Sequence, residues 1–274
     1  MLLAGALRAL ARARGFPVDV IEKDYVLGWL LVGICRSRAG AGLALKGGTA
    51  LSKVYFPGAW RLSEDLDFTF LRPGGARRLA GALATQLPSR VREAAPGLRV
   101  VLRDPPHVVA DDYLQARFRF DGPIGAGTIK VEASREDPVG PVTTRSLPAS
   151  DFDYPRQRVR VYSIENMVAE KLRAMAERRR VRDYYDVWKL VKVGRVDWVA
   201  VRRLFPEKCR FKGVSADSLD RLFPRDLEST LGPYLRAGLT RLTPEPLPPL
   251  STWLRDLRRS VSRELKPVFR ARRD

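Results

Sequence analysis

The sequence contains few of the residues on which several classes of protein depend. Among its 274 residues there are two cysteines, Cys35 and Cys209, and one histidine, His107. Two cysteines do not make a disulfide framework, and no cysteine or histidine cluster has the spacing of a zinc site. A serine–histidine–aspartate triad would have to use His107, which follows two prolines and is expected in a loop or at a strand edge. The sequence therefore argues against a disulfide-stabilised protein, a zinc protein with cysteine and histidine ligands, and a hydrolase with a serine–histidine–aspartate triad.

Long hydrophobic runs are also missing. The longest nearly apolar stretch, Val26 to Cys35, is too short to span a bilayer. At the N-terminus, Arg8, Arg12 and Arg14 follow the apolar residues, whereas a secretory signal carries its basic residues first. We therefore expect a cytoplasmic protein that does not enter the membrane.

Acidic residues are outnumbered by basic ones. The chain has 50 Lys and Arg against 31 Asp and Glu, which gives a formal net charge of +19. Because 45% of the residues are hydrophobic and 30% are charged, the composition is that of a folded protein. A positive charge of this size usually indicates a polyanionic partner. A basic proteome, or solubility through charge repulsion, is the alternative; we favour a nucleic-acid partner.

The most informative stretch runs from Leu45 to Phe70. A short apolar run leads into two glycines at 47–48, and Asp65-x-Asp67 leads into a second apolar run. Glycines after a strand let the backbone approach a ligand closely, and the helix that follows offers free N–H groups to a phosphate. Alternate residues of a strand point to the same side, so Asp65 and Asp67 project together. Two convergent carboxylates suit Mg²⁺, which completes its shell with water and substrate phosphates. The stretch predicts phosphoryl or nucleotidyl transfer.

Four segments of the chain share a pattern with known enzymes. They are Glu22-Lys23-Asp24-Tyr25, Lys46-Gly47-Gly48-Thr49-Ala50-Leu51, Arg61-x-Ser63-Glu64-Asp65-Leu66-Asp67, and Glu170-Lys171-Leu172-Arg173-Ala174 with Arg182-Asp183-x-x-Asp186. The glycine pair and the D-x-D motif resemble the polymerase-β-like nucleotidyltransferase superfamily. The fuller series, which extends over most of the chain, resembles the AbiEii/AbiGii family of bacterial toxin–antitoxin toxins, which includes the MenT toxins. One D-x-D is a weak signal, whereas four segments in the family order are specific.

The resemblance implies an α/β (α+β) fold with two lobes and a cleft between them. Residues 1–155 would form a nucleotidyltransferase lobe with a mixed sheet and N-terminal helices, and residues 156–274 a mainly helical lobe. Hydrophobic periodicity predicts strands at 43–46, 65–71, 98–102, 113–120 and 128–133. It predicts helices at 2–14, 17–35, 48–55, from 163 to at least 177, and at 253–269.

The resemblance also implies roles for the site residues. Asp65 and Asp67 would hold two Mg²⁺ ions, and an acceptor hydroxyl would attack the α-phosphorus of a nucleoside triphosphate (NTP), so that pyrophosphate leaves. Lys171 would neutralise charge on the triphosphate. The residues expected to bind the nucleotide are Lys46, Gly47, Gly48, Thr49, Ser52, Arg61 and Ser63.

A third acidic residue is expected near the pair. In the stretch 128–133, Lys130 and Glu132 alternate with apolar residues, so they share one face of a strand. Glu132 would help to bind the metal or take the proton of the nucleophile. An exposed Lys–Glu pair on a solvated sheet face is an equal alternative from the residues alone. The resemblance to polymerase-β-like enzymes favours Glu132, with Asp186 as the competing candidate.

Basic residues in the second half are candidates for contact with RNA. If the helix beginning near Ser163 continued far enough, Lys171, Arg178 and Arg182 would lie within roughly 20° of one another on its surface. A solvated arginine-rich face is the alternative. The family pattern assigns Lys171 and the Arg182-Asp183-x-x-Asp186 segment to the active site and leaves Arg178 open; Arg178, Arg182 and Asp183 are the candidates for RNA binding. The helix at 253–269 is either packed on the C-terminal lobe or exposed to RNA or an antitoxin, and its spacing does not separate these.

The resemblance implies a toxin of a type IV-like toxin–antitoxin system. Such an enzyme would transfer a nucleotide from an NTP to RNA, most simply to the 3′ end of a tRNA acceptor stem, and so block translation, with a cognate antitoxin as partner. The net charge of +19 agrees with an RNA acceptor. Two alternatives stay open: an enzyme of the same fold that modifies a protein or small molecule, and a non-catalytic protein that binds RNA or the antitoxin.

Overall fold

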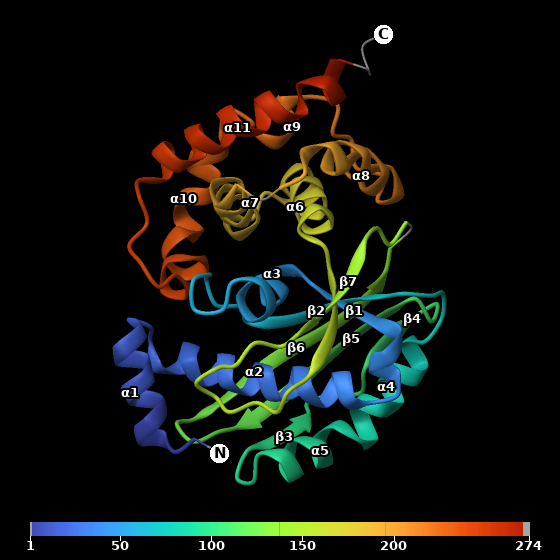
Figure 1. Cartoon of the computed structure of the whole chain (residues 1–274), viewed down its shortest axis with the longest axis vertical. Coiled ribbons are helices and arrows are strands. Elements are labelled where there is room, and N and C mark those ends of the chain that lie inside the picture. The colour runs from blue at the N-terminus through green and yellow to red at the C-terminus, as the bar shows by residue number, and fades with distance from the viewer. Residues whose placement is uncertain (1, 137, 195, 271–274) are drawn as a thin grey trace. The chain divides into compact units, whose positions relative to one another are not determined.

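The computed structural model describes residues 2–136, 138–194 and 196–270, and the chain divides into two compact units (Figure 1). The first unit consists of Met1–Arg135, Val142–Val161 and Leu242–Glu245. The second consists of Glu136–Pro141, Tyr162–Arg241 and Pro246–Asp274. The expected α/β architecture with a mixed sheet is confirmed.

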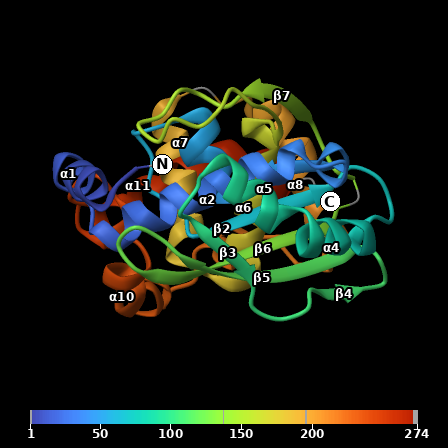
Figure 2. The ribbon, with the colours of Figure 1, turned by 90° about the horizontal axis from the view of Figure 1, so that it is seen from below.

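The first unit is built on a mixed sheet. Its strand order is β3-β5-β6-β2-β1-β8-β7, with β4 paired to β5, and Figure 2 shows β2, β6, β5 and β4 side by side. The strands are β1 (Leu43–Lys46), β2 (Asp65–Phe70), β3 (Arg99–Leu102), β4 (His107–Val109), β5 (Tyr113–Asp121), β6 (Ala126–Arg135), β7 (Val142–Ser146) and β8 (Arg158–Tyr162). The central strand β2 runs antiparallel to β1 and parallel to β6.

Strict alternation gives this sheet one apolar and one polar face. Leu66 of β2 pairs in register with Val131 of β6, which pairs with Ala116 of β5, and all three are buried. The next residue of each strand points the other way, which places Asp67 and Glu132 side by side on the polar face. A shift of one residue in β2 would move both aspartates into the core, so the apolar residues fix which face carries the charges.

Helices of the first unit cover the apolar face. They are α1 (Ala4–Arg14), α2 (Val18–Arg36), α4 (Ala76–Thr85) and α5 (Leu87–Ala94), with a short helix η1 (Ala39–Gly42). From Val20 to Ile34 almost every residue of α2 is buried, because it packs between the sheet, α1 and α5. Gly28 allows the close packing of α2, since a Cβ there would lie 2.2 Å from the Tyr154 ring.

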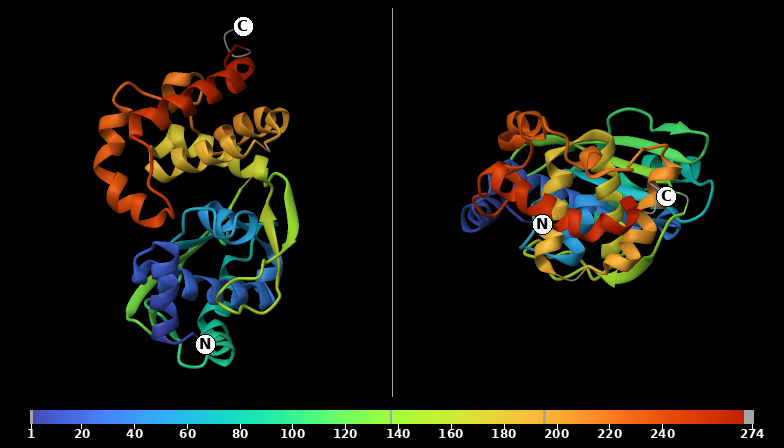
Figure 3. Two further views of the ribbon diagram at one scale, coloured as in Figure 1. Left: turned by 60° about the vertical axis from the view of Figure 1, so that its left-hand side comes forward. Right: turned by 90° about the horizontal axis from the view of Figure 1, so that it is seen from above.

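The second unit is helical. Its helices are α6 (Ile164–Arg178), α7 (Val181–Val193), α8 (Trp198–Phe211), α9 (Leu219–Leu222), α10 (Leu227–Gly238) and α11 (Leu250–Arg270), with η3 (Thr240–Leu242) at the junction. The Ser163 hydroxyl accepts a hydrogen bond from the Asn166 N–H and caps α6. The apolar side of α11, red in Figure 3, packs against α7 and α8 through Trp253, Leu257 and Val261.

The predicted basic stripe along α6 is wrong. The helix ends at Arg178, and Arg179 adopts a left-handed conformation with φ of 45°. Because α7 starts afresh at Val181, Arg182 lies on a different helix from Lys171, and the angular argument fails. No helix in the described part of the chain combines the length and apolar character needed to cross a bilayer.

The buried row beneath the aspartates predicts a large effect on stability. Leu66 is fully buried, so Leu66→Ala should lower the free energy of unfolding by about 2–5 kcal/mol through lost burial and the cavity left behind. Leu3 is 71% exposed, so Leu3→Ala should change it by less than about 0.5 kcal/mol. Urea denaturation of both variants measures the difference. Equal effects would contradict the assigned register.

Candidate active site

The glycine turn lies directly against the second aspartate. β1 ends at Lys46, and Gly47, with φ of +72°, starts α3 (Gly47–Ala50), which continues into a π-helical turn, η2 (Leu51–Tyr55). A Cβ on Gly47 would lie 3.0 Å from Oδ2 of Asp67. Both the positive φ and this close contact favour glycine. The backbone N–H groups at the start of α3 are thus held beside a carboxylate of β2.

The segment before β2 packs on the second glycine. A Cβ on Gly48 would lie 2.7 Å from a guanidinium nitrogen of Arg61 and 3.0 Å from the Ser63 hydroxyl. Arg61 is only 2% exposed, and its Nη1 donates a hydrogen bond to the carbonyl of Leu62 at 3.1 Å. A fixed guanidinium and a hydroxyl beside a glycine turn are groups that bind phosphate oxygens.

Two of the predicted nucleotide-binding residues make internal contacts. The Thr49 hydroxyl donates to the carbonyl of Asp65 at 2.5 Å, which joins α3 to the start of β2. The Ser52 hydroxyl is buried and donates to the Thr49 carbonyl at 3.4 Å. Thr49 therefore positions the turn against the strand, while the Ser52 bond lies within the helical segment that follows the turn.

Charged residues of three strands meet around Asp67. In register it lies between Lys46 of β1 and Glu132 of β6. Burial raises the pKa of Asp67, and the charges of Asp65 and Glu132 raise it further, while Lys130 and Lys46 oppose the rise. A cation placed here would relieve the repulsion between the carboxylates.

Lys130 belongs to this cluster, although the sequence analysis gave it no function. Its Nζ lies 2.9 Å from Oε2 of Glu132, and both side chains are about one-third exposed. Burial alone lowers the pKa of Lys130, but its hydrogen bond to Glu132 and the charge of Asp67 reverse the effect, so the pKa is raised. Glu132 is thus both the neighbour of Asp67 and the ion-pair partner of Lys130. The alternation of 128–133 had indicated that Lys130 and Glu132 share a face.

The carboxylates of Asp65 and Asp67 form a pair of oxygen donors that suits a hard divalent cation. Asp65 and Asp67 offer oxygen ligands from one face of β2, and Mg²⁺ is usually bound by one or two carboxylates together with water and substrate phosphates. In the described residues no group of three His, Cys, Asp or Glu side chains is arranged to hold a metal. The residues present therefore fit a site that a bound triphosphate completes.

Helix α2 holds the parts of the site together. The Glu22 carboxylate accepts a hydrogen bond from the N–H of Ile124, in the turn between β5 and β6, at 2.6 Å. Lys23 lies 3.5 Å from Glu64, in the segment that leads into β2. Consecutive residues of one helix thus contact the turn between β5 and β6 and the segment that leads into β2.

The next residue of this motif fixes the helix that follows the glycine turn. Asp24 Oδ1 lies 2.8 Å from Nζ of Lys53 in η2, and both side chains are buried. The Lys53 ammonium also lies 5.5 Å from the ring centre of Phe152 and 5.4 Å from that of Tyr154. No motif in the sequence marks Lys53, whose only signal is its position six residues after Gly47.

The predicted site residues of the second unit form an ion-pair cluster. Lys171 Nζ lies 2.7 Å from Asp183 and 3.0 Å from Asp186, and Arg178 Nε lies 3.0 Å from Asp183. Burial acts to raise the pKa of Asp183, but the charges of Lys171 and Arg178 outweigh it and the pKa is lowered. Arg182, by contrast, donates to the carbonyl of Gly238 at 2.6 Å. The cluster joins α6 to α7.

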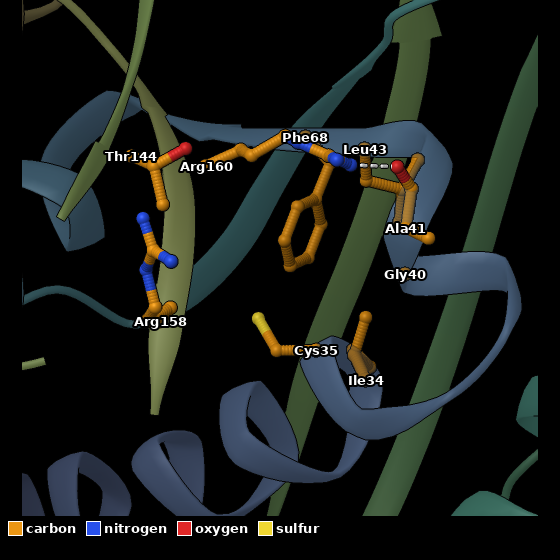
Figure 4. Close-up of a pocket in the computed structure, with 9 residues that line it drawn as sticks. All are labelled: Ile34, Cys35, Gly40, Ala41, Leu43, Phe68, Thr144, Arg158 and Arg160. Carbon is orange, nitrogen blue, oxygen red and sulfur yellow. Dashed lines mark hydrogen bonds between the residues drawn. The ribbon is translucent and has the colours of Figure 1, made fainter. Parts of the chain in front are cut away.

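A separate cavity of about 380 Å³ lies on the other face of the sheet (Figure 4). It contains the Phe68 ring, the Cys35 thiol and the side chains of Arg158 and Arg160. Burial raises the pKa of Cys35 to about 12, so the thiol is protonated at neutral pH and is a poor nucleophile. No carboxylate lines this cavity, and the Asp67 carboxylate lies on the opposite face of the sheet.

Comparisons with known proteins give one family match and several structures of the same fold. The family model described as "Nucleotidyl transferase AbiEii toxin, Type IV TA system" matches residues 29–260. The solved structure of MenT4, a nucleotidyltransferase toxin from Mycobacterium tuberculosis H37Rv, superposes with a TM-score of 0.76 at 20% identity, covering 96% of this chain and 89% of MenT4. JHP933 from Helicobacter pylori superposes with a TM-score of 0.52 at 22% identity, covering 91% and 93%. At these identities the structures show a shared fold. Among curated proteins, none matches the sequence.

The ion-pair cluster predicts a stability difference between two aspartates of the second unit. Asp183→Asn should cost about 3–5 kcal/mol, because it removes one of the two carboxylates that neutralise the buried Lys171 ammonium and the one that binds Arg178. Asp220, whose side chain is 82% exposed beside Arg258, is the matched control, and Asp220→Asn should cost less than about 1 kcal/mol. Urea denaturation at pH 7 measures both.

The pH dependence of this difference follows from the lowered pKa of Asp183. The carboxylate stabilises the fold fully above its unfolded pKa of about 3.9, and this stabilisation is lost as the pH falls toward the folded pKa. The gap between wild type and Asp183→Asn should stay constant above about pH 5 and shrink below it. A gap that widened in acid would contradict the ion pairing.

Proposed function

The chain belongs to the AbiEii family of nucleotidyltransferase toxins of type IV toxin–antitoxin systems, and on this basis we propose that it transfers a nucleotide from an NTP to RNA, using Mg²⁺, with the 3′ end of tRNA as acceptor. It is a nucleotidyltransferase, and its family implies a cognate antitoxin as partner. The observation that carries the proposal is the close approach of Gly47 to the Asp67 carboxylate.

In this proposal the glycine turn binds the triphosphate and β2 holds the metal. The N–H groups after Gly47, the Arg61 guanidinium and the Ser63 hydroxyl bind phosphate oxygens. Asp65 and Asp67 hold Mg²⁺, two ions being expected. When bound, the metal stabilises negative charge on the attacking and leaving oxygens.

Glu132 is the better supported third acid. It lies next to Asp67 in register and is about one-third exposed, so its carboxylate can accept a proton from the acceptor hydroxyl. Lys130 holds the Glu132 side chain in place. Asp186 is fully buried and pairs with Lys171, and the proposed roles of Lys171 and Asp186 rest on the family resemblance alone.

The choice of RNA as acceptor rests on charge. A protein with a net charge of +19 attracts a polyanion and repels a polycationic small molecule. Modification of a protein acceptor is the second candidate.

One experiment separates these candidates. The purified protein is incubated with unfractionated tRNA, Mg²⁺ and each α-labelled NTP in turn. We expect label at the RNA 3′ end, and Asp65→Asn and Asp67→Asn should each reduce it by at least about 10²-fold, since metal binding supplies several kcal/mol. Label on protein would favour the second candidate. Activity that survives both substitutions would contradict the assigned site.

Two glycines with the same backbone conformation test the contact with Asp67. Gly47 and Gly58 have φ of +72° and +75°, so alanine should cost about 1–2 kcal/mol of backbone strain at either position. A Cβ on Gly47 meets Asp67, whereas one on Gly58 meets nothing within 4 Å. Gly47→Ala should lower the transfer rate by about 10²-fold through displacement of the carboxylate, and Gly58→Ala should leave it unchanged. Equal rates at equal stability would contradict the role of the contact.

A further inference from the structure

The polar face of the sheet continues beyond the carboxylates onto β5 and β4. In one register row, Asp65 of β2 is followed by Lys130 of β6 and Arg117 of β5. In the next row, Asp67 and Glu132 are followed by Gln115 of β5 and His107 of β4. Figure 2 shows these four strands as neighbours. The side chains of a row share one face, so the surface next to the carboxylates is made by β5 and β4.

This part of the face carries exposed arginines. Arg117 and Arg119 lie two residues apart on β5, and both are exposed. Arg99 of the neighbouring strand β3 and Arg103, just after its end, are also exposed. They share this side because Val101, which lies between them, pairs with Arg119. Asp121, beside Arg119 at 3.3 Å, offsets one charge. Arg117 and Arg119 are about 7 Å apart along the strand, comparable to the distance between successive phosphates of an extended polynucleotide.

Two aromatic rings lie on β5 and β4, at the end of the rows away from β2. The ring centres of Tyr113 and His107 are 6.2 Å apart, at an interplanar angle of 70°. Gln115 Nε2 donates a hydrogen bond to the Tyr113 hydroxyl at 3.1 Å, which fixes that ring. In register Tyr113 lies diagonally across from Glu132, because its neighbour Gln115 pairs with that residue. Burial raises the pKa of Tyr113, and the charge of Glu132 raises it further.

We propose that the face of β4 and β5 formed by His107, Tyr113, Arg117 and Arg119 binds the single-stranded 3′ end of the RNA acceptor. Arg117 and Arg119 bind its phosphates, and the rings of Tyr113 and His107 stack on its bases. The inference rests on the proposed RNA acceptor and adds where that acceptor lies.

The chemistry of this face favours a single strand of RNA. Arginines bind phosphates, while rings on a sheet stack on unpaired bases regardless of sequence. A paired duplex would keep its bases from the rings. An acidic antitoxin could use the arginines but has no need of the rings, and it becomes an outcome of the test.

The main test is the double variant Arg117→Glu/Arg119→Glu. Its control is Arg78→Glu/Arg92→Glu, the same change of charge at exposed positions of α4 and α5, which cover the opposite face. We expect the first variant to raise KM for tRNA at least tenfold, with KM for NTP unchanged, and the control to change neither. The slope of log K against log salt for tRNA binding should become shallower by about 1.4, since two contacts to a single strand are lost.

The rings are tested by substitution at His107. His107→Ala should weaken binding of tRNA, and His107→Phe should restore it, because phenylalanine also stacks. Neither variant should alter binding of a blunt RNA duplex, which has no unpaired 3′ end.

The outcomes separate this inference from the function on which it rests. If the wild type labels tRNA and the Arg117/Arg119 variant behaves like its control, the inference is wrong and the function stands. If that variant keeps its tRNA kinetics but no longer binds the antitoxin, the face is a protein-binding surface and the inference is also wrong. If the wild type neither binds nor labels RNA, the proposed acceptor fails, and the inference fails with it.

Discussion

The close approach of a glycine to an aspartate is the constraint on which the candidate active site depends. A Cβ on Gly47 would meet the Asp67 carboxylate at 3.0 Å, and Gly47 has a positive φ, so glycine lets the turn after β1 approach the acidic strand β2 without displacing that carboxylate. The antiparallel pairing of β1 with β2 sets that approach, and the hydrogen bond from Thr49 to the Asp65 carbonyl fixes it. The rest of the first unit holds these two elements in place: the apolar row under β2 sets its register, and α2 contacts the surrounding loops.

The charges around this contact divide into two kinds. Around Asp67, carboxylates and lysines of neighbouring strands lie on a partly exposed sheet face, where a bound cation and triphosphate can change the balance of positive and negative charge. Around Asp183, the buried carboxylate is already paired with Lys171 and with the partly exposed Arg178, so these charges contribute chiefly to the packing of α6 on α7. The same residue types therefore have different consequences, and burial decides which applies.

Local patterns in the sequence predicted the parts of the fold that depend on local structure. The alternation at 113–120 and 128–133 gave β5 and β6, and the glycines with the D-x-D motif gave the elements around Asp67. The end of α6 was missed because Arg179 adopts a left-handed conformation that arginine seldom takes. β7 was not predicted, since a short strand whose side chains are largely exposed has no apolar alternation.

Contacts between distant segments were the other limit. The partners of Lys23 and Asp24 lie more than 25 residues away in sequence, and the internal bond of Thr49 depends on a strand pairing, so no spacing rule reveals them. Family resemblance marked several of these residues as important. The structure adds what they touch.

The most direct measurement is a crystal structure of the protein with Mn²⁺ and a non-hydrolysable NTP, with the metal located by anomalous scattering. The account predicts metal bound by the carboxylates of both Asp65 and Asp67, with the β- and γ-phosphates against Gly47 and Gly48. Metal that is bound by neither aspartate, or a triphosphate bound away from the glycine turn, would contradict it.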